Sequence, residues 1–191
     1  MTRVLLFLVS CVFTDNFVFS RLLGSSRLFD KSHRVELALG TGLAVAAVMT
    51  VVSALAWLAN RFILAPLDLE YLQIVAFALI IGIIALIAER IAAKASPKLS
   101  EALGRSLPLL AANCAVLGAA LINLDKAYGL GEAVLQGLFG GIGFLVALEL
   151  MAGVQERLAG SKVPESMKGF PISLVAASLI AMAFMGFAGI G

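Results

Sequence analysis

Charged side chains are scarce in this sequence and make up only 14% of its 191 residues. Soluble domains average about 25% charged residues, so this scarcity argues against a soluble domain. The net charge is only +2, which excludes a strongly basic field for binding nucleic acid. Two cysteines are too few for a disulfide scaffold. The single histidine and the lack of a GxGxxG or P-loop motif indicate neither a zinc nor a nucleotide site.

Apolar runs are what the sequence has in abundance, since 61% of its residues are hydrophobic. A helix needs about 20 apolar residues to cross a bilayer core about 30 Å thick. We therefore predict an all-α membrane protein whose residues 1–191 form a single integral membrane domain of six transmembrane helices. The predicted spans are residues 4–22, 37–59, 71–88, 105–124, 130–154 and 171–190.

The basic residues predict the orientation of these helices in the membrane. Eleven of the 14 Lys and Arg residues lie in, or at the edges of, the loops after the first, third and fifth spans. The positive-inside rule places these loops in the cytoplasm and both chain termini outside it. The eleven residues are Arg21, Arg27, Lys31, Arg34, Arg90, Lys94, Lys98, Arg105, Arg157, Lys162 and Lys168.

Three spans in each half of the chain give the halves, about 1–95 and 96–191, opposite orientations. The first span of each half carries an asparagine at mid-depth, Asn16 or Asn113, and Pro108 favours a break before Asn113. This pattern is typical of two inverted three-helix repeats, with helices 1 and 4 broken and a site at the membrane midplane. The alternative is that both asparagines only hold helices together through hydrogen bonds.

Asp15 and Glu149 are carboxylates in the interior of predicted spans. A charged residue at the centre of a membrane helix costs about 2.5–3.5 kcal/mol, so such residues usually face a cavity or mark an ion route. Both are candidates for a cation path, although Glu149 is also close enough to a span end to reach the interface. The glycine-rich string Gly137–Gly143 predicts close helix packing.

The stretch Leu107–Asn123, LPLLAANCAVLGAALIN, closely resembles the RnfA/NqrE family of membrane subunits. The likeness extends over essentially the whole chain and includes DNFVFSRLLG, KASPKLSEALGRSLPLL, ERLAGSKVPESMKG and AFMGFAG. It implies a multi-pass protein of the bacterial inner membrane, with six helices in two inverted halves and the first helix of each half broken.

The resemblance also implies a function within a complex. The chain would share a [2Fe–2S] cluster with a paralogous RnfE/NqrD-like subunit of opposite topology, each of the two giving two cysteines. It would relay electrons across the membrane between flavin and iron–sulfur subunits, in a ferredoxin:NAD oxidoreductase that translocates Na⁺ or H⁺. No flavin or nucleotide is expected on this chain, and by itself it would not be catalytic.

Cys114 matches the family's second cluster cysteine, with Asn113 shaping the backbone around it. At the first cysteine position this sequence has Ser26, because LLGSSRLF replaces the family's LGLC or LGMC. Three alternatives follow: a serine-ligated cluster, a rearranged one, or an incomplete one. Cys11 lies 15 residues earlier, at a position that the family does not use. The alternative function is an ion- or solute-translocating or structural membrane subunit without its own redox centre.

Overall fold

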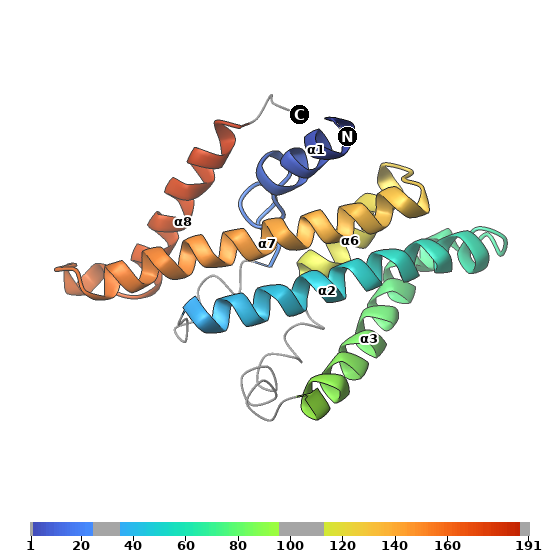
Figure 1. Cartoon of the computed structure of the whole chain (residues 1–191), viewed down its shortest axis with the longest axis horizontal. Coiled ribbons are helices and arrows are strands. Elements are labelled where there is room, and N and C mark those ends of the chain that lie inside the picture. Colours follow the sequence, from blue (N-terminus) through green and yellow to red (C-terminus); the bar gives the residue numbers. More distant parts are fainter. Residues whose placement is uncertain (1, 25–34, 96–112, 188–191) are drawn as a thin grey trace.

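The computed structural model describes residues 2–24, 35–95 and 113–187, and these ranges contain six α-helices (Figure 1). The helices are α1 (Thr2–Val9), α2 (Val35–Ala59), α3 (Gln73–Ala95), α6 (Cys114–Asp125), α7 (Leu130–Ala159) and α8 (Phe170–Met185). Shorter helical turns cover Ser10–Thr14, Asn60–Leu64, Glu70–Leu72 and Glu165–Met167. Because the described ranges contain no β-strand, the predicted all-α class is confirmed.

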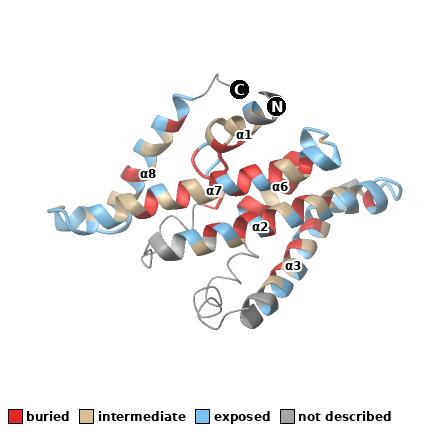
Figure 2. Ribbon diagram, viewed as in Figure 1, coloured by how far each residue is buried: buried red, intermediate tan, exposed pale blue. Residues whose placement is uncertain are grey.

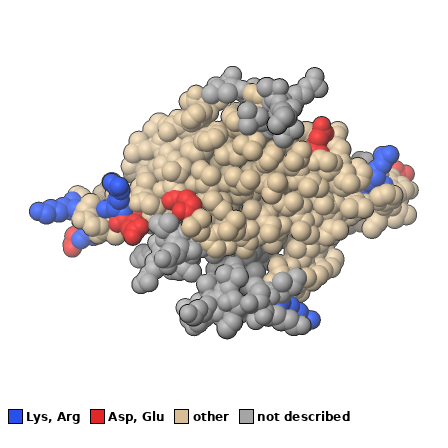
Figure 3. Space-filling model, viewed as in Figure 1, with Lys and Arg blue, Asp and Glu red and all other residues tan. Residues whose placement is uncertain are grey.

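Two helical stretches, Gly42–Leu64 and Leu130–Ala159, are long and apolar enough to cross a membrane. At 1.5 Å per residue, the 30 residues of α7 measure about 45 Å, the thickness of a bilayer with its headgroups. Gln73–Ala88, Cys114–Asp125 and Phe170–Met185 are shorter apolar helices. The charged side chains in Figure 3 lie mainly toward the edges of the molecule, and the middle of this face is almost free of them.

The centre of the fold is the pair α2 and α7, which lie side by side over much of their length (Figure 1). They run in opposite directions, since Gly42 of α2 lies beside Leu145 and Gly137 of α7 lies beside Ser53. A Cβ atom on Gly141 would come within 2.5 Å of the Cα atom of Ala46. The predicted close packing through Gly137–Gly143 is therefore observed, because hydrogen atoms at these positions let the two backbones approach.

The buried core gathers where α2, α6 and α7 meet the turn that follows α1 (Figure 2). Its largest fully buried apolar side chains are Phe17, Phe77, Phe144, Met49 and Met151. By contrast, α3 and α8 carry many exposed apolar residues, as expected for surfaces that face lipid or a neighbouring protein. The beginning of α1 and the end of α8 lie on the same side of the molecule in Figure 1.

The predicted bounds of the second, third, fifth and sixth spans differ from the observed helices by at most seven residues. Within the predicted span 4–22, helical geometry stops at Thr14 and turns cover 15–24. The physical reason is Asn16, whose side chain takes up backbone N–H groups that a helix would bond internally. Residues 105–112 lie outside the described residues, and α6 begins at Cys114.

The contact between Gly141 and Ala46 predicts a specific loss of stability. In Gly141→Ala the added methyl group must push α2 away from α7, and overpacking of this kind costs about 1–3 kcal/mol. Thermal unfolding of the detergent-purified protein should occur at a lower temperature than in the wild type. The matched control is Gly131→Ala on the same helix, where a Cβ atom meets nothing within 4 Å. Equal melting temperatures for the two variants would contradict the packing argument.

Candidate functional site

Cys114 is the first residue of α6, and its side chain is exposed. The preceding residue, Asn113, is the N-cap, and its Oδ1 atom accepts a hydrogen bond from the N–H of Ala115 at 3.1 Å. The N–H groups at a helix N-terminus carry partial positive charge, which favours an electron-rich group beside them. The start of α6 thus presents an accessible sulfur on an electropositive stretch of backbone.

A second segment of the chain reaches this sulfur. The backbone N–H of Gly24 donates a hydrogen bond to Cys114 Sγ at 3.0 Å. Gly24 has φ +76°, a conformation that side chains disfavour. A Cβ atom there would lie 2.6 Å from Phe144 Cε2 and 2.9 Å from Asn113 Oδ1. Only glycine therefore fits where the turn after α1 meets the start of α6.

Asn16 holds that turn in place, and its side chain is fully buried. Its Nδ2 atom donates to the carbonyl oxygens of Val12 at 2.8 Å and Gly143 at 3.0 Å. Its Oδ1 atom accepts from the N–H groups of Val18 at 2.9 Å and Phe19 at 3.2 Å. One amide thus satisfies four backbone groups and ties the turn to α7. The predicted interhelical hydrogen bonding and site-shaping role are compatible with this geometry.

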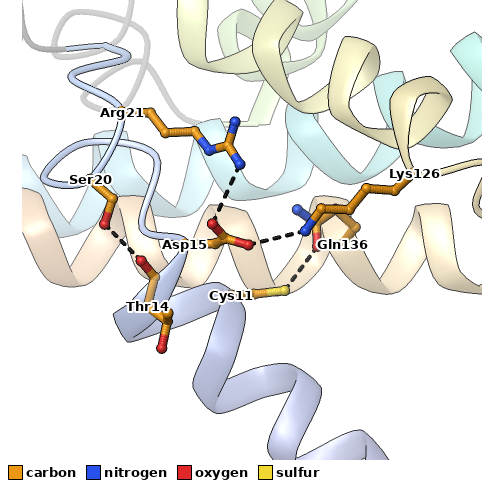
Figure 4. Close-up of polar contacts among 7 residues, drawn as sticks. All are labelled: Cys11, Thr14, Asp15, Ser20, Arg21, Lys126 and Gln136. Carbon is orange, nitrogen blue, oxygen red and sulfur yellow. Dashed lines mark hydrogen bonds and ion pairs between the residues drawn. The ribbon is translucent and has the colours of Figure 1, made fainter. Parts of the chain in front are cut away.

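Asp15, a predicted cation-path residue, lies between two basic side chains (Figure 4). Its Oδ1 atom is 3.4 Å from Arg21, and its Oδ2 atom is 3.0 Å from Lys126. Partial burial acts to lower the pKa of Lys126, but the hydrogen bond from Lys126 to Asp15 and the charge of Asp15 outweigh it and raise this pKa. Both oxygens of Asp15 are thus engaged with the protein's own cations.

Cys11 and Cys114 have different environments. Cys11 is buried, and its thiol donates to Gln136 Oε1 at 2.8 Å (Figure 4). This contact is an internal hydrogen bond between the helical turn after α1 and α7. Neither sulfur belongs to a cluster of three or more His, Cys, Asp or Glu side chains among the described residues.

Glu149, the other predicted cation-path residue, lies on α7. Its Oε1 atom is buried and has no hydrogen-bond partner in the described part of the chain. The same holds for Nδ2 of Asn113, the residue that precedes Cys114. Ser26, the predicted second metal ligand, lies outside the described residues, two positions beyond Gly24.

Sequence reasoning missed four residues that build this region: Gly24, Arg21, Lys126 and Gln136. Arg21 was counted only in the balance of loop charge and Lys126 was not singled out, although their position next to apolar spans was a signal that each needs a partner. Gly24 was visible in SRLLGSS, but its contact with Cys114 joins residues 90 positions apart. A contact between residues so far apart cannot be predicted from their spacing in the sequence.

Comparison with known proteins gives full-length matches. The model of a family described as "Rnf-Nqr subunit, membrane protein" matches residues 4–191. The chain is 46% identical over 182 residues to the A subunit of the Na(+)-translocating ferredoxin:NAD(+) oxidoreductase complex of Acetobacterium woodii, covering 95% of each chain. It is 43% identical over 190 residues to the A subunit of the ion-translocating oxidoreductase complex of Syntrophotalea carbinolica, covering 100% of this chain and 98% of the relative. The protein of the same name from Thioalkalivibrio sulfidiphilus is also 43% identical over 190 residues, with 100% and 99% covered.

The four hydrogen bonds of Asn16 predict a large effect of its removal. Asn16→Ala leaves buried backbone groups without partners, and each such group costs about 1–3 kcal/mol. We expect destabilisation of about 3 kcal/mol or more, measured by chemical or thermal unfolding in detergent. Asn123→Ala is the matched control, because Asn123 is also buried but its amide atoms have no partner among the described residues. It should cost much less, and equal losses in the two variants would refute the assignment.

Proposed function

The chain belongs to the Rnf-Nqr family of membrane subunits, and on this premise we propose that it serves an Rnf-type ferredoxin:NAD oxidoreductase complex as an electron-relaying membrane subunit. The observation that carries the proposal is the setting of Cys114. Its sulfur is exposed, stands at the N-terminus of α6 and accepts the N–H of Gly24. An inert structural cysteine is usually buried among apolar groups, so this exposure favours a ligand role.

The depth of Cys114 supports a position near the middle of the membrane. It precedes Asp125, at the other end of α6, by 11 residues, which corresponds to about 17 Å of helix. Half of a hydrocarbon core about 30 Å thick is about 15 Å. If Asp125 lies at one membrane surface, the sulfur lies close to the midplane. A redox centre there would divide the crossing into two shorter electron-transfer steps.

The described residues fit a [2Fe–2S] cluster in part. Such a cluster takes four protein ligands, usually thiolates, and hydrogen bonds to the sulfurs adjust its reduction potential. Cys114 provides one exposed sulfur with a backbone N–H donor already in place. Ser26 is the candidate for a second ligand from this chain, and the remaining ligands would come from an RnfE/NqrD-like sister subunit. When bound, the cluster supplies one-electron transfer, and this chain's part is to hold and orient it.

The proposed architecture is a pair of inverted repeats, about 1–95 and 96–191. Asn16 and Asn113 support it, because each accepts the N–H of the residue two positions further along the chain, Val18 or Ala115. The same side-chain turn thus occurs in the first predicted span of each half. Exposed apolar residues on α3 and α8 offer surfaces for lipid and for sister subunits. Flavin and iron–sulfur subunits of the same complex would act on either side of the membrane.

For the coupled cation, Glu149 is the better candidate of the two carboxylates. Both oxygens of Asp15 already contact Arg21 or Lys126, whereas Glu149 Oε1 is buried and without a partner in the described ranges. A buried carboxylate oxygen of this kind suits a passing Na⁺ or H⁺. This observation also favours the second candidate function, an ion-translocating subunit that has no redox centre of its own. A relative's name specifies Na⁺, and the choice of ion for this chain follows from that relative only by analogy.

The role of Cys114 predicts a spectroscopic loss. In the purified, reduced complex, Cys114→Ala should remove a [2Fe–2S] electron paramagnetic resonance signal that the wild type shows. The matched control is Cys11→Ser, which keeps a donor to Gln136 and should keep the signal. A complex that lacks this signal in the wild type, yet reduces NAD normally from ferredoxin, would favour the subunit without a redox centre.

The proposed orientation predicts the location of the chain ends. With eleven of 14 basic residues in the loops after spans one, three and five, both termini should lie outside the cytoplasm of the bacterial inner membrane. A C-terminal alkaline phosphatase fusion should therefore be active in cells, and a C-terminal green fluorescent protein fusion should be dark. The reverse pattern would show the opposite topology. A fusion placed after Lys162 is the internal control and should give the cytoplasmic result.

A further inference from the structure

The hydrogen bond between Gly24 and Cys114 joins a backbone donor to a sulfur that is still accessible to a ligand. Its donor is a backbone N–H, which no change of pH removes, and its acceptor is the sulfur itself at 3.0 Å. Gly24 is buried while the side chain of Cys114 is exposed. The donor therefore approaches the sulfur from the protein interior and leaves the outer side of the sulfur open to a ligand.

The position of Gly24 is fixed by the segment that carries it. We call residues 15–24 the strap, since they run along α6 and contact it at both ends. At one end, Asp15 pairs with Lys126, which follows α6 directly. At the other, Gly24 meets Cys114. Between them Leu23 lies against Gly118, where a Cβ atom would come within 2.5 Å of Leu23 Cδ1. The strap thus spans α6, a length of about 17 Å.

We propose that Gly24 is a positioning residue that sets the reduction potential of the centre bound at Cys114, through the N–H that the strap holds against the sulfur. The inference rests on the proposed function. A hydrogen bond to a ligating sulfur draws electron density from it and stabilises the reduced state, which raises the potential. Weakening the bond lowers the potential without removing a ligand.

The site explains why no other residue serves at position 24. Any Cβ atom would meet Phe144 Cε2 at 2.6 Å and would need φ near +76°. Gly24→Ala should therefore displace the amide from the sulfur while Cys114 stays available. Leu23→Ala is a milder change, which removes the packing of the strap on Gly118 and creates no backbone strain at position 24.

The test is a redox titration of the purified complex, followed by the Cys114-dependent electron paramagnetic resonance signal. Gly24→Ala should shift the midpoint to a lower potential and change the line shape, and Leu23→Ala should shift it the same way by less. Gly82→Ala on α3 is the control, since a Cβ atom there meets nothing within 4 Å, and its midpoint should equal that of the wild type. If the complex does not assemble with Gly24→Ala, the midpoint potential of the Leu23→Ala complex serves as the test.

Two contrary results are distinguishable. A wild-type signal with the same midpoint in Gly24→Ala and Leu23→Ala overturns this inference and leaves the proposed function standing. A wild-type complex with no Cys114-dependent signal overturns the proposed function and the inference with it. An equal downward shift in Gly82→Ala would show a general effect of added volume and would also overturn the role of Gly24.

Discussion

Hydrocarbon offers no hydrogen-bond partner, so a chain that leaves helical geometry within a membrane must satisfy its backbone from its own side chains. Asn16 does this for the turn that follows α1. Its amide bonds four backbone groups, including the carbonyl of Gly143 on α7. Without that side chain the four backbone groups would lose their partners, and the turn that carries Gly24 to α6 would be destabilised.

Close backbone approach is the second requirement of the site, and glycine supplies it. Gly143 lets the turn come near enough for its carbonyl to accept from Asn16, and Gly141 lets α2 lie against the adjacent face of α7. The same small volume is needed at Gly24, between Phe144 and Asn113. Packing of small residues thus sets the positions from which a single sulfur, Cys114, is presented. Charge has a peripheral role, in the pairs that Asp15 makes with Arg21 and Lys126.

The parts of the fold that depend on local composition could be predicted from the sequence. Long apolar runs indicated α2 and α7 nearly to their ends, and the glycine string indicated their close contact. Asn16, Asn113 and Cys114 stood out because polar groups are costly inside apolar segments. A break in the first helix was predicted, but its position at Thr14 was not, because an asparagine side chain competing for backbone N–H groups does not alter the hydropathy pattern.

Contacts between residues far apart in the chain could not be predicted from the sequence, for a different reason. Cys11 with Gln136, Asp15 with Lys126 and Gly24 with Cys114 each join segments 90 or more residues apart. The residues around one member of such a pair do not indicate which distant residue it will contact. Asp15 shows the consequence: as an isolated carboxylate in an apolar run it indicated a cation path, whereas in the fold two basic side chains neutralise it. Assigning it to an ion route remains a prediction.

We propose that the turn held by Asn16 delivers a backbone N–H to a sulfur that binds iron at the seam with a sister chain. The most direct test is a cryo-electron microscopy map of the intact complex, at a resolution that shows side chains. We expect iron density bonded to Cys114 Sγ, with the nitrogen of Gly24 within hydrogen-bond distance of the same sulfur. A map in which that sulfur contacts only aliphatic groups, with no metal in bonding range, would contradict it.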